Sequence, residues 1–210
     1  MRAVVRALLY AFFYLIFWPF FFTKKFGNKD YKIDGKTIII ANHFSDFDPF
    51  FIYKLYGFKN KIVFVADNRV KKNIFTRIFC WAFNCVYVNE GAEQNFATVK
   101  KCIDVINQGK VLMIFPEGVI NPSKQCFFDF SKSFCFLARK TGAKVLPLFI
   151  DPNMGLFTKT YIYIGDVFTS EQIASFKDDL VASINVQAKV FDYFGYVSEY
   201  KENKKSKKKE

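Results

Sequence analysis

The chain has a single histidine among its 210 residues, His43, and this scarcity limits the chemistry that the sequence can support. The five cysteines form no Cys-x-x-Cys pair and lie in apolar stretches, so a zinc site is not expected. A cysteine nucleophile would have no second histidine to activate it, and no Gly-x-Ser-x-Gly elbow occurs. We therefore interpret the cysteines as buried, reduced thiols, and we assign no metal and no cofactor.

Acidic residues are also few, with 19 Asp and Glu against 31 Lys and Arg, which gives a net charge of +12. The last ten residues, KENKKSKKKE, account for only a third of this excess. An anionic partner is expected, and lipid, nucleic acid and an acidic carrier protein are the candidates. The sequence shows neither a recognition-helix pattern nor a basic stripe interleaved with stacking aromatics, so we favour membrane lipid and expect no nucleic-acid partner.

The sequence lacks an apolar run of the roughly 20 residues that span a bilayer. The uncharged stretch Ala7–Phe22 has sixteen residues, of which nine are aromatic, and basic residues flank both of its ends. This pattern predicts a membrane-associated helix in one leaflet, on the cytoplasmic face of a membrane. A core helix of the domain is the alternative. We expect an N-terminal anchor over residues 1–26 and a polybasic, disordered tail over residues 197–210.

Between these ends, short apolar runs alternate with helical patterns, and no linker rich in Pro, Gly or Ser divides residues 27–196. Buried strands are predicted over residues 36–41, 61–66, 85–88, 111–115, 144–150 and 160–164. Helices are predicted over residues 48–56, 93–108 and 131–140, and one long helix runs from Ile173 to Phe191 behind a capping box at Thr169. The alternation indicates one α/β domain with a mostly parallel mixed sheet flanked by helices.

His43 follows the strand over residues 36–41, and Asp48 stands where the next helix starts. Five residues along a continuous helix would hold the two side chains about 140° apart. A strand–turn–helix can instead fold the imidazole back to the carboxylate, which would fix the tautomer and leave the other ring nitrogen free as a base. The alternative is that His43 is an ordinary turn histidine and Asp48 only caps the helix.

A second set of residues, Phe115-Pro-Glu-Gly118, ends the strand over residues 111–115. Gly118 permits a tight turn or a close approach of the backbone to a ligand. Glu117 is a charge at a strand end, where carboxylates usually have a partner or contact a polar ligand.

Together these stretches resemble the glycerolipid acyltransferases related to 1-acylglycerol-3-phosphate O-acyltransferase. The matching motifs are Asn42-His43-x-x-x-x-Asp48, Phe115-Pro116-Glu117-Gly118 and Val145-Leu146-Pro147-Leu148, and the resemblance covers about residues 35–166. It implies that His43 and Asp48 are catalytic, that the acyl donor is acyl-CoA or an acyl carrier protein, and that the acceptor is the hydroxyl of a lyso-phospholipid in phospholipid biosynthesis. It also implies an acceptor site formed by Phe115, Pro116, Glu117 and Gly118.

The sequence departs from this family at two positions that are thought to grip the acceptor's phosphate. Val119 and Ile120 stand where the family usually has Thr-Arg, and Glu90 stands where it commonly has a second arginine. A lysine does not replace the bidentate guanidinium fork. We therefore keep two alternatives, a different lyso-lipid or amino-lipid acceptor and a catalytically inactive member of the fold. The candidates for relocated phosphate contacts are Arg69, Lys71, Lys72, Arg77 and Lys124.

Overall fold

The computed structural model describes residues 11–12, 15, 22–57, 60–68, 74–82, 85–88, 92–123, 126–153 and 157–207. Most of the predicted N-terminal anchor, including residues 1–10 and 16–21, lies outside this set. Among the described residues, no helix is both long and apolar enough to cross a membrane.

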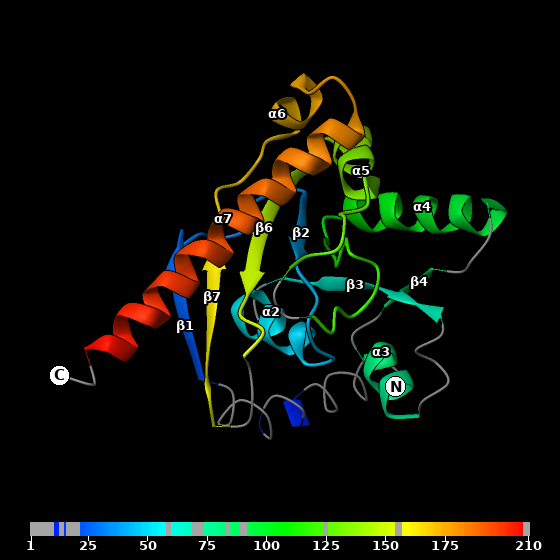
Figure 1. The fold of residues 1–210 in the computed structure, drawn as a ribbon. Coiled ribbons are helices and arrows are strands. Elements are labelled where there is room, and N and C mark those ends of the chain that lie inside the picture. Colours follow the sequence, from blue (N-terminus) through cyan, green and yellow to red (C-terminus); the bar gives the residue numbers. More distant parts are fainter. Residues whose placement is uncertain are drawn as a thin grey trace.

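The predicted α/β architecture is confirmed, with one seven-stranded sheet between two layers of helices (Figure 1). The strand order across the sheet is β1-β7-β6-β2-β5-β3-β4. All neighbouring strands pair in parallel except β6 and β7, which are antiparallel. The strands are β1 (Phe22–Gly27), β2 (Thr37–Ala41), β3 (Ile62–Asp67), β4 (Val86–Val88), β5 (Val111–Ile114), β6 (Lys144–Ile150) and β7 (Lys159–Ile164).

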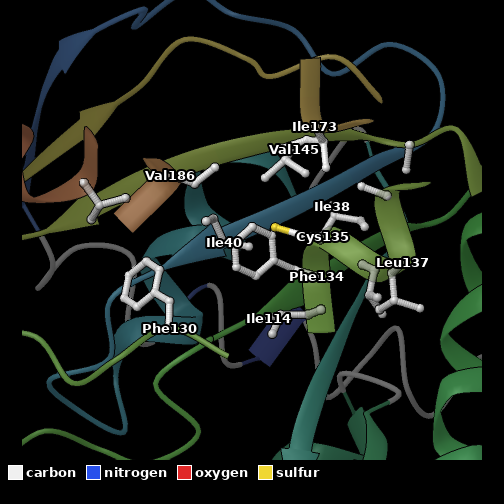
Figure 2. Packing of buried hydrophobic residues seen from close by; sticks show 14 of the residues in the cluster. Ile38, Ile40, Ile114, Phe130, Phe134, Cys135, Leu137, Val145, Ile173 and Val186 are labelled. Atoms are coloured by element: carbon white, nitrogen blue, oxygen red, sulfur yellow. The ribbon is translucent and has the colours of Figure 1, made fainter. Parts of the chain in front are cut away.

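Alternate residues of the central strands enter two separate hydrophobic cores, because successive side chains of a strand point to opposite faces. Ile38 and Ile40 pack under four helices, and Figure 2 shows them gathered with Phe134 and Val186. Ile39 belongs to the other core, beneath the remaining two helices. The first core is covered by α4 (Ala92–Asn107), α5 (Ser133–Thr141), α6 (Ser170–Ser175) and α7 (Asp179–Ser206), and the second by α2 (Asp48–Tyr56) and α3 (Ile74–Ala82).

The prediction of a single long helix from Ile173 to Phe191 is wrong, because two helices occupy this stretch. The capping box at Thr169 opens α6 as expected. Phe176 then adopts an extended backbone, and Asp178 begins α7 by accepting a hydrogen bond from the Val181 N–H at 2.9 Å. This second side-chain cap separates the two helices.

Both predicted boundaries at the chain ends also need correction. The anchor predicted over residues 1–26 includes Phe22–Phe26, which instead belong to the edge strand β1 and pair with β7. Residues 197–206, expected to be disordered, continue α7 (Figure 1). The reason is a set of contacts that the lysine-rich composition conceals, since Val197 is buried and the ring of Tyr200 packs edge-on against Phe26.

The cysteines are free, and Cys80, Cys102 and Cys135 are buried as predicted. Burial raises the pKa of the Cys102 thiol to about 11 and that of Cys135 to about 12, so both remain protonated at neutral pH. Cys126 is exposed, which corrects the prediction for that residue.

Candidate active site

The site lies where β2 ends, at the carboxyl edge of the parallel strands. There the side chain of Asn42 is fully buried and pairs with the backbone of Ile150 at the end of β6. Asn42 Nδ2 donates to the Ile150 carbonyl, and the Ile150 N–H donates to Asn42 Oδ1, each at 2.8 Å. This pair ties β2 to β6 immediately before His43, so the position of the imidazole is fixed by the sheet.

The chain turns after His43 and returns Asp48 to the imidazole, which is the geometry that the sequence predicts. His43 Nδ1 and Asp48 Oδ2 are 2.8 Å apart. The same oxygen accepts the backbone N–H groups of Phe44 at 2.7 Å and Ser45 at 2.9 Å. Asp48 is therefore the first residue of α2 but does not cap it, because its carboxylate turns back into the loop. The alternative of a simple helix cap does not hold.

Asp48 is completely buried, whereas the side chain of His43 is 16% exposed. Burial raises the pKa of the Asp48 carboxyl, and the hydrogen bonds from His43, Ser45 and Phe44 act in the opposite direction by favouring the anion. The second oxygen, Oδ1, is buried without a hydrogen-bond partner among the described residues. Asp48 Oδ2 thus binds His43 Nδ1 together with two backbone N–H groups of the loop, and His43 Nε2 is the nitrogen that remains for a substrate.

Phe115 forms one wall of this site. Its ring stacks on the imidazole of His43, with centroids 4.0 Å apart and an interplanar angle of 13°. The stacking leaves the imidazole little freedom to rotate out of line with Asp48. The structure therefore places Phe115, predicted as an acceptor contact, directly against the catalytic candidate.

Glu117 is buried, and both of its carboxylate oxygens are engaged within the protein. Oε1 accepts the backbone N–H of His43 at 2.8 Å, and Oε2 accepts the backbone N–H of Phe128 at 2.9 Å. Glu117 thereby joins the loop after β5 to the loop that carries the imidazole. Its direct contact with an acceptor stays a prediction, while its contact with the His43 loop is a feature of the fold.

Asn121 completes this connection and was not identified from the sequence. It is fully buried, and its Nδ2 donates to Glu117 Oε2 at 2.9 Å and to the Cys126 carbonyl at 2.8 Å. Its own N–H donates to the carbonyl of His43 at 2.7 Å. The only sequence signal was the Asn-Pro dipeptide at 121–122, which indicates a turn but not its partners.

The backbone around Gly118 forms the tight turn that the sequence predicts. Gly118 has φ +74°, a left-handed conformation that glycine adopts without steric cost, and its N–H donates to the Phe115 carbonyl at 3.0 Å. The Pro116 carbonyl accepts the N–H of Ser131 at 2.9 Å. These bonds place Phe115 and Glu117 on opposite sides of one turn, next to His43.

Val119 and Ile120, which replace the family's Thr-Arg, are both exposed. Phe47 after β2 and Phe157 before β7 are exposed as well, and the sheet topology places all four at the same edge as His43. Of the candidates for relocated phosphate contacts, Arg77 is exposed on α3. The other four candidates and Glu90 lie outside the described residues; the four are Arg69, Lys71, Lys72 and Lys124.

The fold and this geometry define a class of protein before any comparison is made. It is an α/β protein whose histidine, oriented by a buried aspartate, can take a proton from a hydroxyl group or from water at the carboxyl edge of the sheet. Neither serine nor cysteine is hydrogen-bonded to this imidazole within the described part of the chain. The site therefore fits direct transfer to an acceptor, or hydrolysis, rather than a covalent enzyme intermediate.

Comparison with known proteins gives the family. Residues 24–151 match the family model described as Acyltransferase, and since this match covers more than half of the chain, the protein belongs to the Acyltransferase family. The chain is 27% identical over 138 residues to the 1-acyl-sn-glycerol-3-phosphate acyltransferase of Borreliella burgdorferi, covering 65% of this chain and 54% of that protein. It is 26% identical over 123 residues to a probable 1-acyl-sn-glycerol-3-phosphate acyltransferase of Mycoplasma pneumoniae, covering 57% and 46%.

The chain thus spans about half the length of the curated relatives it matches. Among solved structures, the crystal structure of the 1-acyl-sn-glycerophosphate acyltransferase PlsC from Thermotoga maritima aligns with a TM-score of 0.71. This alignment covers 94% of this chain and 81% of that chain at 21% sequence identity. At this identity the likeness concerns the fold, and it agrees with the mostly parallel sheet and flanking helices described above.

Proposed function

We propose that the protein is a membrane-associated O-acyltransferase that moves a fatty acyl group from a thioester to the hydroxyl of a lyso-phospholipid, with 1-acylglycerol-3-phosphate as the first candidate. The observation that carries the proposal is the contact of His43 Nδ1 with the buried carboxylate of Asp48 at 2.8 Å. Membership of the Acyltransferase family and the similarity to 1-acyl-sn-glycerol-3-phosphate acyltransferases support the acyl-transfer chemistry.

In the proposed reaction, His43 Nε2 removes the proton of the acceptor hydroxyl as its oxygen attacks the thioester carbonyl. The new carbon–oxygen bond forms a tetrahedral intermediate, which collapses by breaking the carbon–sulfur bond. The leaving thiolate takes the proton back from the imidazolium, so that His43 ends the cycle neutral. Asp48 keeps Nδ1 protonated throughout and stabilises the transient cation.

The donor in this proposal is acyl-CoA or an acyl carrier protein, because both present the same thioester. A net charge of +12 attracts either one, since a carrier protein is acidic and coenzyme A carries phosphates. The reaction needs only that the thioester carbonyl reach the hydroxyl beside His43 Nε2.

We place the reaction at the cytoplasmic face of a membrane, where both the product and the lyso-lipid acceptor reside. Support comes from the exposed side chains of Phe47, Val119, Ile120 and Phe157, which lie at the same sheet edge as His43. Exposed apolar side chains gathered at one edge of a protein often mark a surface that contacts lipid or another protein.

The second candidate is acyl transfer to an acceptor without a phosphate monoester, and a specific observation favours it. Val119 and Ile120 occupy the exposed positions next to Gly118 where the family has Thr-Arg. Two apolar side chains cannot bind a dianionic phosphate, but they can pack against an acyl chain or a neutral headgroup.

The test is an acyl-transfer assay on the purified full chain, with labelled acyl-CoA and acyl carrier protein offered to a panel of lyso-lipids. His43→Ala and Asp48→Asn should each lower kcat by about 10²–10⁴-fold, the usual contribution of general-base catalysis. Asp46→Asn is the matched control, because Asp46 is an exposed acid on the same turn and should leave kcat within about twofold.

The outcomes separate the candidates. Transfer to lysophosphatidic acid supports the first acceptor, and transfer only to a phosphate-free acceptor moves the proposal to the second. Absence of transfer to every acceptor, together with identical behaviour of His43→Ala and the unmodified chain, would contradict acyltransferase activity and leave an inactive member of the fold.

A further inference from the structure

The two chain ends that the sequence marks as basic lie against one another in the structure. Lys24 of β1 donates a hydrogen bond from Nζ to the hydroxyl of Tyr200 in α7, across 176 positions of sequence. The same ammonium lies 4.2 Å from the ring centroid of Tyr200 and 5.3 Å from that of Phe26. Figure 1 shows the last turns of α7 beside the first strand. The lysine-rich end of the chain therefore meets the strand that follows the apolar run.

The contacts of α7 show where its later lysines lie. Tyr193 stacks on Tyr163 near the end of β7, with ring centroids 4.4 Å apart, and Tyr200 packs on Tyr161 at 5.8 Å. As α7 advances, it thus moves back along β7 toward the start of that strand. Lys204 follows Tyr200 by four residues, on the same side of the helix and about one turn further on. It therefore extends toward the first residues of β7 and β1.

A third lysine reaches the same place from the sheet. Lys159 begins β7 and pairs with Phe22 of β1. Because side chains alternate along a strand, Lys159 shares the α7-facing side of the sheet with Tyr161, and Lys24 shares it with Phe26. The hydrogen bond from Lys24 lowers the pKa of the Tyr200 phenol, and the nearby positive charges of Lys204 and Lys159 lower it further.

This positive charge is not neutralised within the described residues. Asp151, which is buried after β6, binds Lys201 with Nζ 2.9 Å from Oδ1. None of the described carboxylates forms an ion pair with Lys24, Lys159 or Lys204. The cluster thus holds three ammonium groups from three elements around one tyrosine. Its positive charge favours the binding of an anion.

The topology places the cluster at the same sheet edge as His43. β7 runs antiparallel to β6 and β1 runs parallel to β7, so both begin at the edge where β2 and β6 end. Phe22, the first residue of β1, is exposed there and is the last residue of the sixteen-residue apolar run. An anion beside exposed apolar groups is the chemistry of a lipid headgroup at a bilayer surface.

We propose that Lys24, Lys159 and Lys204, arranged around Tyr200, bind the phosphate headgroups of anionic lipids and hold the His43 edge of the sheet against the bilayer. The site is separate from the acceptor position beside His43, and its occupation does not require acyl transfer. A lipid phosphate is favoured over a soluble anion because the lysines share their edge with the exposed apolar side chains of Phe22 and Phe157.

The experiment measures cosedimentation of the full chain with vesicles of phosphatidylcholine, alone or mixed with phosphatidylglycerol. The test variant is Lys24→Gln/Lys159→Gln/Lys204→Gln. The matched control, Lys100→Gln/Lys140→Gln/Lys177→Gln, removes the same charge from exposed lysines of other surfaces. Binding to neutral vesicles reports the contribution of the apolar run, and the ratio of anionic to neutral binding reports the lysines.

A lysine close to an anionic leaflet strengthens partitioning by about fivefold. The ratio of anionic to neutral vesicle binding should therefore fall by at least about tenfold more in the test variant than in the control. Equal losses in the two variants would show general attraction to charge and overturn the proposal. Displacement from anionic vesicles by free phosphate or coenzyme A, at matched ionic strength, would also overturn it in favour of a soluble-anion site.

Two further variants distinguish loss of the site from loss of folding or of catalysis. Lys159→Gln/Lys204→Gln leaves the bond from Lys24 to Tyr200 intact, so it tests the site even where the triple variant fails to fold. His43→Ala retains every lysine of the cluster and should bind vesicles as the unmodified chain does. A chain that binds anionic vesicles through these lysines but transfers no acyl group would contradict the proposed reaction and support the headgroup site.

Discussion

Asn42 and Ile150 exchange two hydrogen bonds, in which the side-chain amide of Asn42 donates to the carbonyl and accepts from the N–H of the buried Ile150, each at 2.8 Å. Asn42→Ala would leave the N–H and the carbonyl of Ile150 without these partners in a buried position. Each buried group left unsatisfied costs about 1–3 kcal/mol, so for the two groups we expect the free energy of unfolding in urea to fall by about 2–6 kcal/mol.

Asn185→Ala is the control for this prediction, because Asn185 is exposed on α7 and bonds only within its own helix, to the Val181 carbonyl. It should cost less than about 1 kcal/mol. An equal effect of the two substitutions would show that the tie between β2 and β6 contributes little to stability.

The buried carboxylate of Asp48 predicts how activity depends on pH. Burial raises its pKa, so Asp48 takes up a proton at a higher pH than an exposed aspartate would, and the acidic limb of kcat/KM is displaced upward. The folded state holds this proton more tightly than the unfolded chain does, and protonating Asp48 therefore does not itself favour unfolding. Acidification should abolish activity at a pH where far-ultraviolet circular dichroism is unchanged. Loss of activity and of the circular dichroism signal at the same pH would show that unfolding causes the acidic limb.

The bond from Asn121 to Glu117 predicts a strong effect of a change that keeps side-chain size. Asn121→Asp sets a carboxylate 2.9 Å from Glu117 Oε2, and the repulsion should loosen the hold of Glu117 on the His43 N–H. We expect kcat to fall by about tenfold or more with little change in KM, and stability to fall by about 2–4 kcal/mol.

The double variant Asn121→Asp/Glu117→Gln tests this explanation, because the glutamine amide can donate to the new carboxylate. It should recover part of both kcat and stability, and Asn185→Asp should change neither by more than about twofold or 0.5 kcal/mol. No recovery in the double variant would mean that the side chain of Asn121 acts through its other bond, from Nδ2 to the Cys126 carbonyl.

The exposed pair that follows Gly118 predicts a change of acceptor preference. Val119→Thr/Ile120→Arg restores the residues that the family usually has, and both positions are exposed enough to accept them. If the arginine reaches the acceptor phosphate, kcat/KM for lysophosphatidic acid should rise by about 10–100-fold relative to a phosphate-free acceptor. This is the change in kcat/KM that corresponds to the free energy of one charge-assisted hydrogen bond.

Val119→Thr/Ile120→Lys carries the same charge without the bidentate fork and should give a smaller rise. An unchanged preference in both variants would show that this chain binds the acceptor headgroup with residues elsewhere.

The strands of the sheet centre were predicted to within one residue because each is buried on both faces and therefore appears as an uninterrupted apolar run. β1 could not be found in this way, since Phe-Thr-Lys-Lys-Phe-Gly is an edge strand whose pairing depends on β7, far along the chain. The last turns of α7 were mistaken for a disordered tail for a similar reason, because the rings that Tyr200 contacts belong to β1 and β7.

Some residues of the candidate site can likewise be predicted from the sequence, and others cannot. His43 and Asp48 could be paired from their spacing around a strand end, and the structure brings them together. Glu117 was recognised as a residue of the site, but its bonds to the backbone of His43 and Phe128 depend on how two loops meet. For Asn121 the sequence indicates only a turn, since a buried amide is distinguished from an exposed one by its neighbours in the fold.

The pairing of β1 with β7, beneath the end of α7, also bears on how the protein is made. The first strand to leave the ribosome can reach its partners only after nearly the whole chain has been synthesised. Until then the exposed Phe22 end of β1 lacks its partner strand, and chain growth itself gives it time to meet a bilayer or a chaperone. α7 then packs over the paired strands through Tyr200, so loss of its last turns should delay maturation more than it alters the finished site.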